Sequence, residues 1–167
     1  MAVVALKSTQ ITNRDATPAV LNNARTSGAD LKHRRAIMAI TSGDSAASTY
    51  RMFEIPSNAV VVSVRVSAPD IGTTTTADVG LYQTTANGGA VVDADFFASA
   101  IVLNAGAISK SDVTHESAVY TLANGEKPVW EALGLTADSM RTYDVVLTLV
   151  GAADGTGTVL VEIDYTA

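Results

Sequence analysis

The sequence contains no cysteine, which excludes a disulfide scaffold, a zinc–thiolate site and a thiol nucleophile. Aromatic residues make up only 5% of the 167 residues, so aliphatic side chains must fill most of any core. No apolar run approaches the roughly 18 residues that a membrane-spanning helix needs, and residues 1–7 are too short to be the apolar region of a signal peptide. We therefore expect a chain that is made and used in soluble form and does not enter a membrane.

Hydrophobic residues make up 47% of the chain and charged residues 17%, which is typical of a globular protein and not of a disordered one. Valine is abundant among the hydrophobic residues. Because β-branched side chains are stiff and fit a pleated surface, this composition favours sheet. The length allows one domain with a core of its own, plus an arm.

Positive charge is concentrated at the N-terminal end. Residues 1–35 hold six basic and two acidic residues (6 − 2 = +4), whereas residues 36–167 hold five basic and fifteen acidic residues (5 − 15 = −10). Between Ser8 and Asp30 the apolar residues are isolated and show no period, so they cannot offset the roughly 1–2 kcal/mol per residue that ordering a backbone costs. We therefore predict an extended basic N-terminal arm over residues 1–35 and a β-sandwich body over residues 36–167. The expected docking residues of the arm are Lys7, Arg14, Arg25, Lys32, Arg34 and Arg35.

Short runs of β-forming residues separated by turn residues predict strands throughout the body. In the clearest run, the even-numbered valines from Val60 to Val66 alternate with other residues, which predicts that these valines face the core. Two segments predict short helices: Asp93–Ser99, with Asp93 as a cap, and Lys127–Leu133, with Pro128 near its start. The predicted strands are Arg35–Thr41, Tyr50–Ile55, Ala59–Ser67, Ala77–Tyr82, Ile101–Leu103, Ala118–Leu122, Tyr143–Val150 and Thr158–Tyr165.

The last two predicted strands are joined by the Gly- and Ala-rich segment Gly151–Gly157, which predicts that they pair as an antiparallel hairpin. About eight short strands at this spacing are typical of an antiparallel β-sandwich. We therefore predict an all-β fold with jelly-roll-like connections, an N-terminal arm and one or two short helices. Val146 and Val150, opposite the core face of their strand, are either contacts between subunits or part of a strand buried on both faces.

No motif in the sequence carries a recognisable chemistry, so we predict no enzyme activity and no catalytic, metal or cofactor site. His33 lies among basic residues and His115 in a polar stretch, and both are expected to be loop histidines. Asp93 and Asp95 have a spacing seen in metal sites, but capping of a helical turn explains Asp93 better. Gly151–Gly157 lacks the lysine of a phosphate-binding loop.

Nucleic-acid binding is also not expected. The arm contains no aromatic residue on which a base could stack, and the acidic body would repel a polyanion. A basic arm is better matched to an acidic protein surface.

Three segments resemble the small decoration, or cement, proteins encoded near the capsid genes of tailed bacteriophages. They are Phe53–Val62, Ala77–Tyr82 and Gly89–Ala98, together with the C-terminal pair of strands. The resemblance implies a jelly-roll or sandwich body on the outer surface of the virion capsid, bound to the major capsid protein and assembled as a homo-oligomer. A homotrimer is favoured and a dimer is possible. The arm lies outside the matched segments, so its docking role rests on its charge alone.

Two other functions remain open from the sequence. A carbohydrate- or receptor-binding module of a virion, in a head fibre or tail, would also use a β-sandwich, but it needs exposed aromatic side chains, for which Tyr82 and Trp130 are the candidates. A small hydrolase would need a histidine beside a carboxylate, and only His115 next to Glu116 offers that pair.

Overall fold

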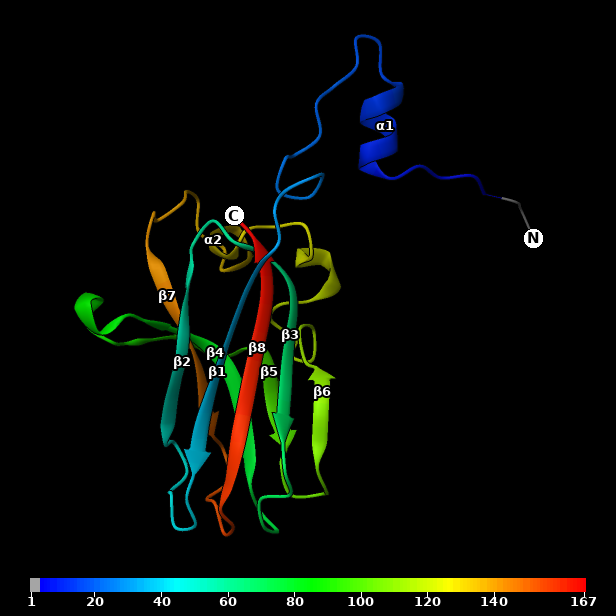
Figure 1. The fold of residues 1–167 in the computed structure, drawn as a ribbon. Coiled ribbons are helices and arrows are strands. Elements are labelled where there is room, and N and C mark those ends of the chain that lie inside the picture. Colours follow the sequence, from blue (N-terminus) through cyan, green and yellow to red (C-terminus); the bar gives the residue numbers. More distant parts are fainter. Residues whose placement is uncertain (1–3) are drawn as a thin grey trace.

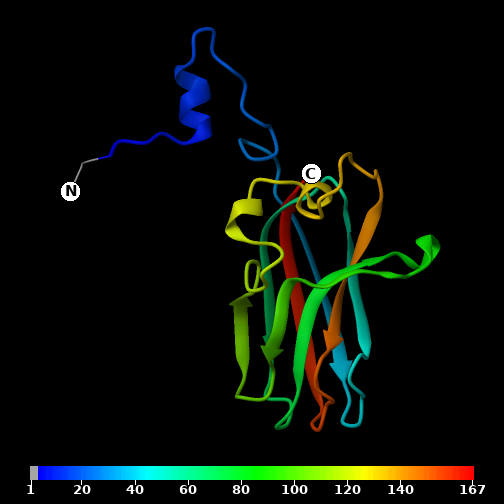
Figure 2. The same cartoon turned by 180° about the vertical axis from the view of Figure 1, so that it is seen from behind.

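The computed structural model describes residues 4–167, and eight strands in it form two four-stranded sheets packed face to face (Figures 1 and 2). One sheet has the order β1-β8-β3-β6 and the other β2-β7-β4-β5. Within residues 4–167, no helix is both long enough and apolar enough to cross a membrane. The strands are β1 (Lys32–Ile40), β2 (Thr49–Pro56), β3 (Val60–Ala68), β4 (Thr76–Gln83), β5 (Val91–Val102), β6 (Ile108–Asp112), β7 (Thr142–Leu149) and β8 (Gly157–Thr166).

The strands pair in nested order, first with last and second with second-last, and this order identifies the topology. β1 pairs with β8, β2 with β7, β3 with β6 and β4 with β5, all antiparallel. The chain is therefore a long hairpin that is folded over on itself, so that consecutive strands alternate between the two sheets except at the β4–β5 turn. This is the jelly-roll arrangement, and the predicted all-β antiparallel sandwich with jelly-roll connections is confirmed.

The predicted C-terminal hairpin is wrong, although both of its strands are present. β7 and β8 lie in different sheets: β7 between β2 and β4, and β8 between β1 and β3. The segment Gly151–Gly157 crosses from one sheet to the other at the end of the sandwich opposite the arm (Figure 1). Alternation along a strand reveals which face it buries but not which strand lies beside it.

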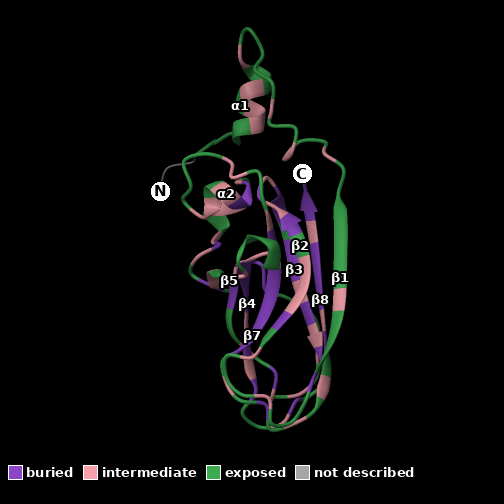
Figure 3. Cartoon of the chain, turned by 90° about the vertical axis from the view of Figure 1, so that its left-hand side faces the viewer, coloured by how far each residue is buried: buried purple, intermediate pink, exposed green. Residues whose placement is uncertain are grey.

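The core fills the space between the sheets, and Figure 3 shows buried residues along strands of both sheets. Most of it is aliphatic, as the composition requires. Its aromatic part is a cluster of Phe96, Phe97 and Tyr120, with ring centroids 4.9–5.5 Å apart. Burial raises the pKa of Tyr120 to about 12.

The predicted helical turn at Asp93–Ser99 is wrong, because the segment belongs to β5. The pairing of β4 with β5 shifts register three times, including between Val79 and Leu81. β5 thus contains extra residues relative to β4, and its adjacent Phe96 and Phe97 are both fully buried. The expected short helix near Lys127–Leu133 is present as α2 (Val129–Ala132).

β3 departs from strict alternation. Its register with β8 shifts between Val61 and Ser63, so Val62 is 55% exposed while Val61 is buried. Val64 and Val66 face the core as predicted. Val60 is buried but does not belong to the core cluster, whereas Val61 does. The prediction that all four even-numbered valines face the core is therefore wrong at Val60 and Val62, because the extra residue of a bulge changes which face of the strand the side chains occupy.

Three smaller differences concern the strands themselves. Ala118–Leu122 forms no strand, although Tyr120 within it is buried and its N–H donates to the carbonyl of Phe96. β6 was not predicted, because its sequence is mostly polar and four of its five residues are exposed. Val146 is fully buried and Val150 is 48% exposed, so β7 is buried on both faces at Val146.

The two 3₁₀ turns are η1 (Thr85–Asn87) and η2 (Leu122–Asn124).

Candidate functional site

The N-terminal arm leaves one end of the sandwich and extends away from it (Figures 1 and 2). None of residues 4–31 is buried. The arm contains a short helix, α1 (Thr9–Asp15), whose cap Ser8 accepts a hydrogen bond from the Ile11 N–H at 3.4 Å. This helix was not predicted, because it buries no apolar face and therefore shows no hydrophobic period. Local capping is what defines its start.

Apolar side chains of the arm are exposed to solvent. Leu21 is 94% exposed and Leu6 is 89% exposed. Nothing in the described part of the chain covers them. The remaining members of this set, which we call the arm apolar residues, are Val4, Val20 and Leu31.

Part of the positive charge of the arm is paired within the arm. Lys7 Nζ lies 2.8 Å from one carboxylate oxygen of Asp15, and Arg14 Nε lies 2.9 Å from the other. The hydrogen bonds from Arg14 and Lys7 lower the pKa of Asp15. Exposed ion pairs of this kind are weak, so both cations can exchange Asp15 for a partner's carboxylate at little cost.

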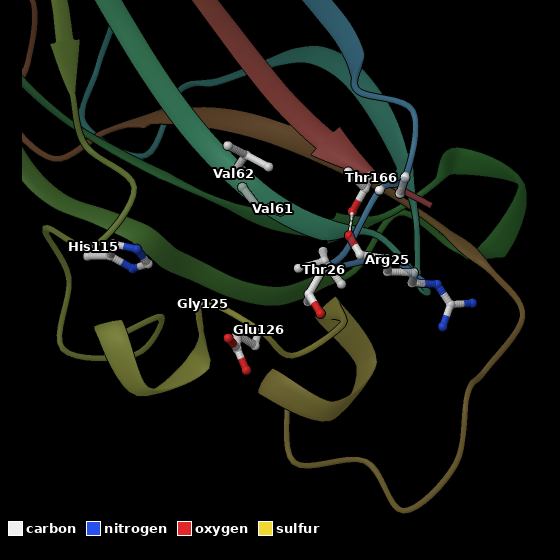
Figure 4. Close-up of a pocket in the computed structure, with 11 residues that line it drawn as sticks. Arg25, Thr26, Val61, Val62, His115, Gly125, Glu126 and Thr166 are labelled. Atoms are coloured by element: carbon white, nitrogen blue, oxygen red, sulfur yellow. Dashed lines mark hydrogen bonds between the residues drawn. The ribbon is translucent and has the colours of Figure 1, made fainter. Parts of the chain in front are cut away.

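The base of the arm is attached to the body at Arg25. The Thr166 hydroxyl donates a 2.8 Å hydrogen bond to the Arg25 carbonyl, next to a cavity of about 370 Å³ between arm and body (Figure 4). The Arg25 side chain points outward in that view, away from the cavity. The cavity is lined by Arg25, Thr26, Gly28, Ala29, Val60, Val61, Val62, His115, Gly125, Glu126 and Thr166.

The other three predicted docking residues lie in the sandwich and not in the arm. Lys32, Arg34 and Arg35 belong to β1, which begins four residues before the predicted boundary at residue 36. Arg34 Nε donates to the Tyr165 hydroxyl at 3.2 Å. The six basic residues therefore form two groups, one on the arm and one on an edge strand. The start of β1 was missed because a polar, exposed edge strand shows no alternation.

A charged network on the outer face of this sheet was not predicted. His33 Nδ1 lies 2.7 Å from one carboxylate oxygen of Asp164, and Arg65 Nη2 lies 2.7 Å from the other. Although burial opposes the shift, hydrogen bonds from His33, Arg65 and Ser63 lower the pKa of Asp164. Glu162, beside it, is buried, and one of its carboxylate oxygens has no hydrogen-bond partner within the described residues. Only the strand register brings these residues together.

The residues considered for catalysis are held in other contacts. His115 Nδ1 lies 2.9 Å from the Tyr120 carbonyl, and its ring stacks on the Tyr120 ring with centroids 5.3 Å apart. The Glu116 carboxylate instead accepts a 2.6 Å hydrogen bond from the Ser99 N–H. The two neighbours are thus held by different partners.

The Asp93–Asp95 pair lies in β5 and caps no helix, which corrects the capping interpretation. Burial and the neighbouring Asp95 raise the pKa of Asp93. In residues 4–167, no group of three or more histidine, aspartate or glutamate side chains is arranged to hold a metal ion.

Of the two aromatic side chains considered for ligand binding, Tyr82 is buried. Its hydroxyl lies 2.9 Å from the Thr148 hydroxyl, and the Arg51 guanidinium lies over its ring at 5.6 Å. Tyr82 is therefore unavailable for stacking on a sugar, which corrects that expectation. Trp130, in α2, is partly exposed.

No protein-family model matches the chain, and no curated protein matches it in sequence. Its fold resembles that of chains in three solved bacteriophage capsids. A chain of the cyanophage Pam1 capsid asymmetric unit aligns over 91% of this chain and 96% of its own length, with 18% identity and a TM-score of 0.53. Because the identity is so low, this similarity shows the fold alone.

The two other similarities are weaker. A chain of the capsid of Ralstonia phage GP4 has 18% identity and a TM-score of 0.49, covering 82% of this chain and 84% of its own. A chain of the acid-stable capsid of Helicobacter pylori bacteriophage KHP30 has 14% identity and a TM-score of 0.44, covering 83% and 92%.

Proposed function

We propose that the protein is a structural component of a tailed-bacteriophage virion that decorates or cements the outer surface of the capsid. In this role the arm docks on the major capsid protein and the jelly-roll body forms a homo-oligomer, with a trimer favoured. The fold shared with a chain of the cyanophage capsid supports a place in the virion. The protein acts by binding, without a chemical step.

The observation that carries the docking role is the state of the arm. Leu6 and Leu21 are almost fully exposed, and the two arm cations that form ion pairs, Lys7 and Arg14, pair only with the exposed Asp15. An exposed leucine side chain contributes roughly 1.5–3 kcal/mol when a partner buries it completely. The arm is therefore built to gain its contacts from a surface that this chain does not supply.

Deletion of residues 1–30 tests the docking role. We expect the remaining chain to keep its near-ultraviolet circular dichroism, since these residues are not in the core, and to lose binding to purified capsids that lack the protein. Binding is measured by co-sedimentation. Unchanged binding by the deletion variant would contradict the proposal.

A matched pair of variants separates the apolar contacts from general surface effects. Leu6→Ser with Leu21→Ser should weaken capsid binding by about ten-fold or more, given the burial energy of two leucines. Val91→Ser with Val102→Ser changes two body residues that are 57% and 49% exposed, and should leave binding unchanged. Equal losses in both variants would mean that the arm has no special role.

The oligomeric state has its own test. The mass of the purified protein in solution, measured by light scattering, should correspond to a trimer. A monomer at high concentration would contradict oligomerisation through the body while leaving the docking role of the arm in place.

A further inference from the structure

The free edge of β1 differs from the other three sheet edges. β1 lies at the end of its sheet and pairs only with β8; among residues 4–167, no backbone hydrogen bond joins it to another strand. Its register is continuous over nine residues, which is roughly 30 Å of strand. In an antiparallel ladder every second residue points its N–H and C=O away from the partner. β1 therefore offers a long row of unpaired backbone donors and acceptors.

The other edges are interrupted in ways that block the addition of a strand. β2 ends in Pro56 and shifts register between Arg51 and Phe53. β5 shifts register three times against β4, and β6 is only five residues long. Bulges, prolines and short length are three of the devices that protect sheet edges from pairing, and charged side chains are another. Among the sheet edges of residues 4–167, β1 alone has no bulge, no proline and a long continuous register, and its charges cover only its first half.

The side chains of β1 divide the strand into a basic half and an apolar half. Lys32, Arg34 and Arg35 are exposed, and none of them forms an ion pair with a described residue. In the other half Ile37 is 65% exposed and Met38 is 38% exposed. The charges can protect only the basic half of this edge. The apolar half, with Ile37 and Met38 exposed, has no such protection.

The sequence of β1 also argues against a second copy of β1 as the strand that pairs with this edge, because β1 contains no carboxylate to pair with its cations. In the antiparallel self-pairing centred on Ala36, Arg35 would lie opposite Ile37 and Arg34 opposite Met38. Each cation would thus face an apolar side chain and gain no carboxylate. The strand that already pairs with β1 shows the suitable chemistry, because Glu162 of β8 lies opposite Arg35, Asp164 opposite His33 and Leu160 opposite Ile37.

We propose that the free edge of β1 receives an extended segment of another protein, which adds to the sheet as an antiparallel strand. Its apolar residues face Ile37 and Met38, and acidic residues later in the same segment face Lys32–Arg35. Backbone hydrogen bonds supply affinity and the charges set the register. This contact goes beyond the docking of the arm, since it uses the body alone and remains when residues 1–30 are deleted.

The test uses a synthetic peptide with the β8 sequence, residues 157–167 of this chain, carrying a fluorescent label. The matched control is the same peptide with Glu162→Lys and Asp164→Lys. Binding to the purified full-length protein is followed by fluorescence anisotropy at low salt. We expect the β8 peptide to bind at least about ten-fold more tightly than the charge-reversed control, and this difference to shrink in about 0.5 M salt.

Hydrogen exchange locates the bound peptide. Slower exchange of amides in β1, with no change in β6, is the expected result. Equal affinity of the two peptides, or peptide binding without slower exchange in β1, would overturn the proposal. Since no capsid is present, either failure is distinct from a failure of the arm to dock.

Protein variants test the two halves of the strand. Lys32→Gln with Arg35→Gln should weaken peptide binding by about five-fold or more, because it removes the charge without placing a new carboxylate beside Glu162. Ile37→Ser tests the apolar half and should also weaken binding. Lys110→Gln, on the opposite edge of the same sheet, should have no effect. Undiminished binding by both β1 variants would exclude this edge as the site.

Discussion

Asp154 shows how one residue can hold together two loops that are far apart in the sequence. Its carboxylate accepts hydrogen bonds from the Thr73 and Thr74 N–H groups, at 2.8 Å and 3.2 Å, and from the Thr73 hydroxyl. The hydrogen bond from the Thr73 hydroxyl, followed by those from the backbone, lowers the pKa of Asp154 to about 2. Gly72 has a φ of +74° and lies so close to Asp154 that a Cβ would collide with the carboxylate. The loop that contains Asp154 therefore requires threonines and a glycine at residues 72–74 of the other loop.

The lowered pKa predicts how Asp154 affects stability as the pH changes. A carboxyl group whose pKa is lower in the folded state stabilises the fold above its unfolded pKa of 3.8, and this contribution is lost as the pH falls toward about 2. We expect Asp154→Asn to lower the Tm by a few degrees at neutral pH. The difference from wild type should shrink between about pH 4 and pH 2, measured by thermal melts followed by circular dichroism.

Asp70→Asn is the control for this prediction, because Asp70 is exposed and lies near the same loop without bonding to it. It should leave the Tm nearly unchanged across the same range of pH. A difference between wild type and Asp154→Asn that stays constant down to the lowest pH would show that the charge of Asp154 does not matter.

Among the strands, β3 differs most clearly from what the alternation of its sequence predicts. Val62 and Val64 belong to one uninterrupted alternation in the sequence, yet Val62 is 55% exposed and Val64 is fully buried. The bulge between Val61 and Ser63 causes the difference, because one extra residue changes which side chains of the strand point toward the core. The strand thereby presents one valine to solvent beside the cavity at the base of the arm.

The bulge predicts unequal effects of the same substitution at two neighbouring valines. Val64→Thr should lower the free energy of unfolding by about 1–3 kcal/mol, because it buries a hydroxyl group without a partner. Val62→Thr should change it by no more than about 0.5 kcal/mol, as is usual at an exposed position. Urea denaturation measures both. Equal losses would mean that strict alternation holds and that Val62 faces the core.

At the scale of the whole molecule, the jelly-roll wrapping makes both sheets depend on the C-terminal strands. β7 lies between β2 and β4, and β8 lies between β1 and β3. Without them no sheet keeps more than one of its pairs of neighbouring strands. The N-terminal arm is the opposite case, since none of its described residues is buried.

Truncation after Thr142 should therefore abolish cooperative folding. We expect the truncated chain to show no sigmoidal unfolding transition in urea and no ordered near-ultraviolet circular dichroism, whereas the chain lacking residues 1–30 keeps both. A soluble truncated protein with a cooperative transition would show that β1–β6 contain a core of their own.

The sequence by itself determined the fold class, most strand positions and the excess of basic residues in residues 1–35. These follow from composition, alternation and charge, which are local properties of the chain. It predicted the jelly-roll connections from the number and spacing of the strands. It also correctly placed α2 near Lys127–Leu133.

The tertiary structure alone decided which strands lie side by side and which residues meet across them. The β7–β8 hairpin was wrong because pairing depends on the path of the whole chain, which local alternation does not contain. The phase of β3 at Val62 and the burial of Phe96 with Phe97 depend on bulges. The free edge of β1 exists only because β8 covers one side of that strand and nothing described covers the other. Such relations are non-local, and a list of residues in order does not reveal them.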